Sequence, residues 1–143
     1  MIPVSTYEDA LLNALWRQRG GTNWWFLEVP IGYADAPANS RRHRRLDAVV
    51  LPFPRPEVSP QLQDLDELTE AVVGAKVELV EAKKRLNTDV VGQLLAGASM
   101  FSSRYPKHGP LVLTAVVEHN RDAALRWYCA SVGIEVVETK PLR

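Results

Sequence analysis

The sequence predicts an α/β protein in which helices flank a mixed β-sheet, with a core order of α-β-β-β-α-β followed by one more helix and strand. Three observations support this class. An amphipathic helix opens the chain, three strand-like segments follow before the next long helix, and residues 110–119 form a continuous apolar run typical of a strand buried on both faces. With 143 residues and 16.0 kDa, the chain is predicted to form one domain, residues 1–143.

The first half of the chain supplies one helix and two strands. The helix is expected from Ser5, because Ser5 and Glu8 stand at the spacing of a capping box, and Gly20-Gly21 ends it. Aromatic and branched residues predict a strand at 23–32. A second strand at 44–52 ends where prolines can no longer donate ladder hydrogen bonds.

The second half begins with residues 52–76, which we interpret as an insertion with a short acidic helix in its latter part. Three sequential strands suggest an antiparallel meander, and a helix between the third and fourth strands implies a parallel crossover. The remaining elements are expected as a strand at 77–84, a helix at 89–105, a strand at 110–119, a helix capped by Asn120 and an edge strand at 134–139.

Composition and charge exclude several classes of protein. No apolar run of about 18 residues exists, so no membrane partner is expected. The single cysteine, Cys129, excludes an internal disulfide and favours an intracellular location. The 17 basic and 17 acidic residues balance, which counts against non-specific nucleic-acid binding, yet residues 41–45 read RRHRR, so a local basic patch remains.

Charged residues interrupt two of the predicted strands. Glu81 and Lys83 share a face of the third strand, about 7 Å apart. If the second and third strands pair, Asp47 lies beside Glu81. Two adjacent carboxylates repel unless a cation or a shared proton separates them, and Mg²⁺ prefers such oxygen ligands.

Asp47, followed after a connecting segment by Glu81-Ala82-Lys83 and then a helix, resembles the PD-(D/E)xK phosphodiesterase superfamily, including small Holliday-junction resolvases and restriction endonucleases. The element order from residue 5 to about 117 matches that group. The resemblance implies that Asp47, Glu81 and the Ala82 backbone carbonyl hold Mg²⁺, for which Mn²⁺ can substitute, and that Lys83 assists the attacking water. Leu46 replaces the proline of the motif's name.

Further residues follow from the same resemblance. It assigns a catalytic role to Gln93 on the following helix and a metal-ligating role to Glu8, whose alternative role is helix capping. Basic residues near the site are expected to contact phosphates. They are Arg41, Arg42, His43, Arg44, Arg45, Lys84 and Arg85.

The resulting hypothesis is a Mg²⁺-dependent DNA endonuclease that acts as a homodimer or as a subunit of a larger assembly. Two alternatives stay open. One is an inactive relative that binds only nucleic acid or a partner protein; the other is a scaffold without a nucleic-acid role. An exposed Glu81–Lys83 ion pair of little energy would fit that last alternative.

Overall fold

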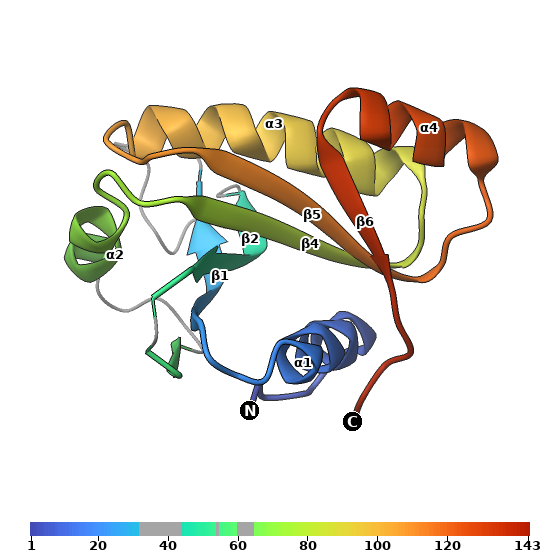
Figure 1. The fold of residues 1–143 in the computed structure, drawn as a ribbon, viewed down its shortest axis with the longest axis horizontal. Coiled ribbons are helices and arrows are strands. Elements are labelled where there is room, and N and C mark those ends of the chain that lie inside the picture. The colour runs from blue at the N-terminus through green and yellow to red at the C-terminus, as the bar shows by residue number, and fades with distance from the viewer. Residues whose placement is uncertain (32–43, 54, 60–64) are drawn as a thin grey trace.

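The computed structural model describes residues 1–31, 44–53, 55–59 and 65–143 and contains a six-stranded mixed sheet flanked by helices (Figure 1), which confirms the predicted α/β class. The elements in chain order are α1 (Tyr7–Gln18), β1 (Trp24–Pro30), β2 (Arg45–Leu51), β3 (Val58–Ser59), α2 (Leu65–Ala71), β4 (Val77–Arg85), α3 (Thr88–Arg104), β5 (Leu111–His119), α4 (Ala123–Ser131) and β6 (Ile134–Glu138). No helix in the described ranges is both long enough and apolar enough to cross a membrane.

The strands lie in the order β3-β1-β2-β4-β5-β6. Antiparallel pairing joins β1 to β2 and β2 to β4, so the predicted meander is confirmed. The α3 helix connects β4 to the parallel strand β5, and α4 connects β5 to the parallel edge strand β6. The two-residue strand β3 pairs in parallel with β1 at the other edge; the sequence did not predict it.

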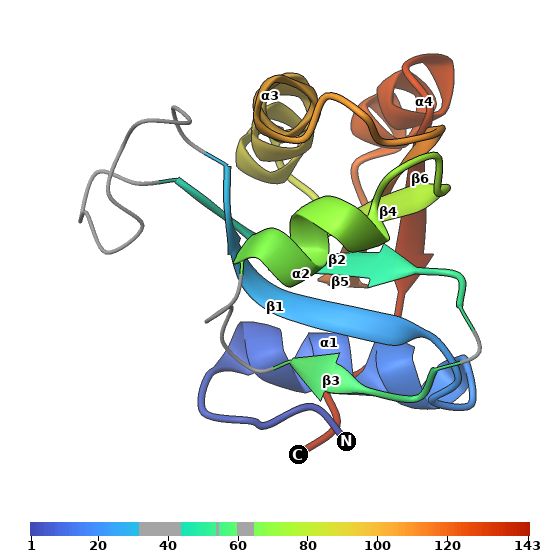
Figure 2. The same ribbon diagram turned by 90° about the vertical axis from the view of Figure 1, so that its left-hand side faces the viewer.

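Helices cover both faces of the sheet (Figure 2), with α3 and α4 on one face and α1 on the other. Alternating strand residues divide the core into two clusters. Leu79 and Val49 belong to the cluster on the α3 side, whereas Val80 and Val50 pack against α1. Leu68 of α2 is fully buried in the α3-side cluster, so this acidic helix contributes one leucine side chain to the core.

Both chain ends lie against α1 (Figure 1) because Asn13 holds them there. Its side chain is 3% exposed. The Oδ1 atom accepts a hydrogen bond from the backbone N–H of Ile2 at 3.3 Å, and Nδ2 donates to the carbonyl of Leu142 at 3.0 Å. A buried amide with both ends satisfied fixes the two terminal segments on the helix, across 129 residues of sequence in one case.

Two predicted helix caps are wrong by one or two residues. The capping box of α1 consists of Thr6 and Asp9, not Ser5 and Glu8: Thr6 Oγ1 accepts from Asp9 N–H at 3.1 Å, and Asp9 Oδ2 accepts from Thr6 N–H at 3.0 Å. Asp122, rather than Asn120, caps α4. Sequence spacing alone did not separate neighbouring residues of equal capping ability.

Candidate active site

Strands β2 and β4 separate at Asp47 and Glu81. Their regular pairing ends with Ala48 opposite Val80, which leaves the two acids as the next opposing residues, as the meander predicts. The Oδ2 atom of Asp47 accepts a hydrogen bond from the backbone N–H of Ala82 at 2.8 Å. The Asp47 carboxylate thus accepts the hydrogen bond from the Ala82 N–H that a backbone carbonyl of β2 would accept in a regular ladder. The two strands diverge around the acidic pair.

A cavity of about 380 Å³ opens at this divergence. It collects side chains from α1, β1, β2, β4 and α3, which are far apart in the sequence. Every predicted catalytic or metal-ligating residue lines it. The lining consists of Ser5, Thr6, Glu8, Asp9, Leu12, Glu28, Arg44, Arg45, Asp47, Glu81, Ala82, Lys83 and Gln93. The tertiary structure thus brings the predicted set into one polar hollow.

The acidic pair is poorly solvated. Glu81 is only 6% exposed, and burial, followed by the Asp47 charge and a hydrogen bond with Asp47, raises its pKa to about 9. Burial also raises the pKa of Asp47, against the opposing effects of hydrogen bonds from Glu81 and Ala82 and of the Lys83 charge. Without a cation, Glu81 therefore keeps its proton at neutral pH.

No ion pair joins either acid to a basic side chain within the part of the chain that the structure describes. In the same described ranges, no three carboxylate, imidazole or thiol groups are placed together as ligands of one ion. Glu8 therefore lines the cavity without completing a preformed three-ligand group. Because Asp9 performs the capping, the competing role that the sequence suggested for Glu8 is removed.

The α3 helix brings Gln93 to the cavity. The Asn87 side chain accepts a hydrogen bond from Val90 N–H at 3.0 Å and so fixes where the helix begins. One turn beyond Gln93, Gly97 lies against Leu46: a Cβ atom there would approach a Leu46 methyl carbon to 2.9 Å. The absent side chain permits α3 to lie close to β2, which places Gln93 on the site.

The predicted basic residues divide into four groups. Arg44 and Arg45 line the cavity, whereas the predictions for Arg41, Arg42 and His43 fall outside the described residues. Lys84 points to the face of the sheet that α1 covers, where its ammonium lies 5.6 Å from the centre of the Tyr7 ring. Arg85 lines a separate cavity of about 370 Å³, shared with Leu86, His119, Arg121 and Asp122.

Sequence reasoning missed two acidic residues that line the cavity, the helix-capping Asp9 and Glu28 in β1, of which Glu28 has no other role in the fold that the sequence suggested. Its carboxyl pKa is raised by burial and then by the charge of Asp47. A single acid inside the apolar stretch WWFLEVP was the available signal, of the same kind that identified Glu81 in β4.

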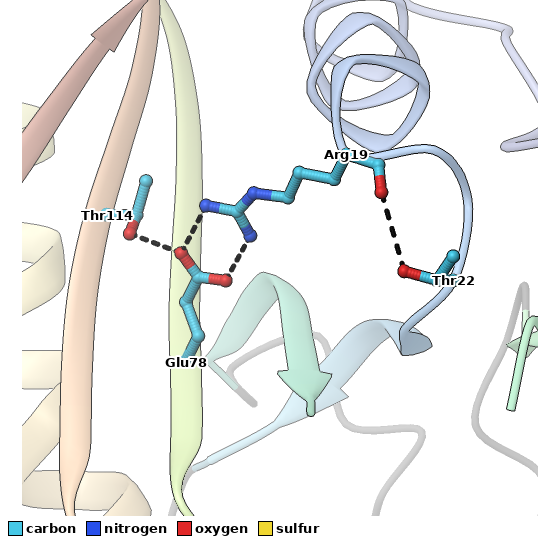
Figure 3. Close-up of polar contacts among 4 residues, drawn as sticks. All are labelled: Arg19, Thr22, Glu78 and Thr114. Atoms are coloured by element: carbon cyan, nitrogen blue, oxygen red, sulfur yellow. Dashed lines mark hydrogen bonds and ion pairs between the residues drawn. The ribbon is translucent and has the colours of Figure 1, made fainter. Parts of the chain in front are cut away.

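A second carboxylate of β4, Glu78, has a different environment (Figure 3). Both of its oxygens are bound by the guanidinium of Arg19 at the end of α1, with Nη2 to Oε2 at 2.8 Å. Thr114 of β5, fully buried, donates its hydroxyl to Oε2 at 2.5 Å. The Glu78 side chain raises the pKa of Arg19 through this hydrogen bonding. The contact ties α1 to the centre of the sheet.

Two solved structures share the fold over nearly all of this chain. A repair endonuclease from Pyrococcus abyssi matches with a TM-score of 0.52 at 14% identity, covering 99% of this chain and 50% of that one. The EndoMS–dsDNA2 complex matches with a TM-score of 0.51 at 12% identity, covering 100% of this chain and 48% of that one. This chain therefore spans about half the length of each and has an endonuclease-like fold.

No sequence model of a known family matches this chain, and no curated protein sequence matches it. The likeness to the two solved structures accordingly concerns the fold. The chemistry of the site must be argued from its own residues.

Proposed function

We propose that this chain is a metal-dependent nuclease that hydrolyses phosphodiester bonds in DNA, with a site of the PD-(D/E)xK type. The observation that carries the proposal is the convergence of Asp47, Glu81 and Lys83 in one cavity, where the buried carboxylate of Glu81 faces the half-buried carboxylate of Asp47. Burying an unpaired acidic pair is costly, so a site that binds a cation explains it better than a structural role. The endonuclease-like fold supports the same conclusion.

The donor set fits Mg²⁺ or Mn²⁺. Mg²⁺ is usually held by one or two carboxylates, with waters and substrate phosphates completing its octahedron, and Asp47 and Glu81 supply two. Ala82 donates its N–H towards β2, and in a strand the N–H and C=O of one residue point to the same side, so the Ala82 carbonyl also faces the gap. When bound, the ion would offset charge on the phosphate and lower the pKa of water.

The other groups of the cavity would act on the substrate. Lys83 can orient the attacking water and balance phosphate charge through its ammonium, and Gln93 can position the same water through its amide. Arg44 and Arg45 extend from the cavity along the entry of β2, where guanidinium groups bind phosphates in a bidentate manner. One of the two fold neighbours is described as a dsDNA complex, which favours DNA as substrate.

Cleavage of labelled duplex, single-stranded and four-way-junction DNA in Mg²⁺, Mn²⁺ or EDTA tests the proposal. The wild type should cut at least one substrate only with metal. Asp47→Asn and Lys83→Ala should reduce the rate by about 10²–10⁴-fold, the usual range for loss of a group that moves or orients a proton. Equal cutting by all three proteins, or cutting that persists in EDTA, would contradict it.

An inactive nucleic-acid-binding module is the second candidate, and the basic lining from Arg44 and Arg45 favours it over a scaffold. Binding of the same DNA by all variants, without cleavage under any metal condition, would establish this alternative. We also propose a homodimer, which would let two sites act on two strands; a monomeric mass by light scattering would contradict this.

A further inference from the structure

Glu28 has a backbone conformation that side-chain-bearing residues rarely adopt. Its φ is 54°, and within residues 1–31, 44–53, 55–59 and 65–143 every other residue with positive φ is a glycine. The left-handed region is unfavourable for residues with a Cβ atom, and most of all for branched ones. A strained residue in the middle of a strand and at the edge of the cavity calls for an explanation.

The ladder between β1 and β2 is interrupted at this residue without a change of register. Leu27 pairs with Ala48 and Val29 pairs with Leu46, so both strands advance by two residues across the interruption. Glu28 and Asp47, which would pair between them, do not. The left-handed residue therefore does not insert an extra residue, as a bulge would.

The interruption reverses which face of the sheet each side chain occupies. Leu27 packs on the α1 side, so alternation would place Val29 there, but Val29 lies on the α3 side. The partner strand changes in the same way: Ala48 packs on the α1 side, whereas Leu46, two residues away, contacts Gly97 of α3.

The reversal determines where Asp47 points. Because Leu46 and Ala48 face opposite sides, the residue between them belongs to neither face, and its carboxylate instead reaches along the sheet to the Ala82 N–H. Arg45 holds the turned backbone by donating from Nη1 to the carbonyl of Glu28 at 3.1 Å.

We propose that Glu28 is a positioning residue of the proposed nuclease site, whose left-handed backbone reverses the pleat of β1 and β2 and so aims the Asp47 carboxylate at Ala82 and Glu81. The role belongs to the backbone of Glu28. It predicts that residues able to adopt positive φ replace Glu28 with little effect on the aim of Asp47, whereas a β-branched residue does not. The catalytic consequence rests on the proposed function, but the aim of Asp47 does not.

Amide hydrogen exchange at Ala82, followed by NMR in EDTA, measures this aim directly because Asp47 is the acceptor of that N–H. Glu28→Val should speed exchange at Ala82 at least tenfold, as should Asp47→Ala, whereas Glu28→Gly and Glu28→Asn should stay within threefold of the wild type. Glu138→Val is the matched control, since this exposed glutamate of β6 has an ordinary strand conformation. The amides of β5 serve as an internal reference for global opening.

Equal protection of Ala82 in all Glu28 variants, or equal loss in Glu28→Gly and Glu28→Val, would overturn the proposal. If Glu28→Val opens the whole sheet, Glu28→Ala takes its place under the same criterion, because it keeps a Cβ atom without branching. DNA cleavage measured in parallel should fall at least a hundredfold in Glu28→Val and less than tenfold in Glu28→Gly. If the wild type cuts no DNA while the Ala82 exchange pattern holds, the nuclease proposal fails and the positioning role stands. If the wild type cuts DNA but the Ala82 exchange pattern is absent, the positioning role fails and the nuclease proposal stands.

Discussion

Glu78 and Glu81 lie three residues apart in β4 and point to opposite sides of the sheet. Their carboxylates are both shielded from solvent but have opposite kinds of neighbour, a basic side chain for Glu78 and an acidic one for Glu81. Glu78 receives two hydrogen bonds from Arg19 and one from Thr114. Glu81 is more deeply enclosed and faces another acid, Asp47, whose own hydrogen-bond donor is the backbone of Ala82.

The difference separates a structural carboxylate from one available to a ligand. The charge of Glu78 is compensated within the fold, and the compensation holds α1 on the sheet (Figure 3). No ion pair compensates the charge of Glu81 among the described residues, and the Arg44 charge offsets the effects of burial and of Asp47 only in part, so a cation from solution would favour its ionised form. The two residues look alike in the sequence, because each is an acid inside a strand of branched, apolar residues.

The largest expected difference between Glu81 and Glu78 is in the rate of DNA cleavage. Glu81→Gln removes a proposed metal ligand without changing side-chain size, so DNA cleavage in saturating Mg²⁺ should fall by about 10³-fold, within the range found when a group stabilising transition-state charge is lost. Glu78→Gln, the matched control in the same strand, should cut DNA within a few-fold of the wild type. Equal losses of DNA cleavage in both variants would show that Glu81 and Glu78 do not differ in their role.

The second expected effect is the contribution of the Arg19–Glu78 contact to stability. Arg19→Met keeps the aliphatic stem but leaves Glu78 without its ionic partner, so urea denaturation should show a loss of about 1–3 kcal/mol in the free energy of unfolding. Arg17→Met, an exposed arginine of the same helix, should change it by less than about 0.5 kcal/mol. A loss at position 19 no larger than at 17 would show that the Arg19–Glu78 contact contributes little.

The remaining effect is a gradual change of stability with pH. The folded pKa of Glu81, about 9, lies above its unfolded value of 4.5, so the folded chain keeps a proton that the unfolded chain releases in that interval. Stability is therefore greatest below the lower value and falls as pH rises towards the upper one, by at most about 1.4 kcal/mol per pH unit.

Urea denaturation in EDTA at about pH 6 and about pH 8 should show this decline in the wild type. Glu81→Gln should lack it, because the amide does not titrate, and comparison of the two proteins removes the contribution of other groups. A decline of the same size in both proteins would place its origin elsewhere.

The core strands could be predicted from the sequence, whereas the residues at which two helices begin could not. The strands at β1, β2, β4, β5 and β6 and the helix α3 were predicted because long apolar or alternating patterns leave few other ways to bury their side chains. The caps of α1 and α4 were misassigned, since Ser5, Thr6, Asn120 and Asp122 all have capping side chains and only the observed backbone selects among them. The short strand β3 carries too little pattern to be detected.

The amino-acid sequence by itself determined the element order, the two apolar faces of the sheet and the acids that interrupt β2 and β4, because these follow from local periodicity and from the cost of burying charge. Only the tertiary structure decided that Glu78 meets Arg19 and that Glu28 enters the site, whereas the approach of Asp47 to Glu81 was expected from the sequence if the second and third strands paired. Those outcomes depend on strand register, on the divergence of β2 from β4 and on one left-handed residue. Each is a long-range or backbone property that side-chain pattern does not encode.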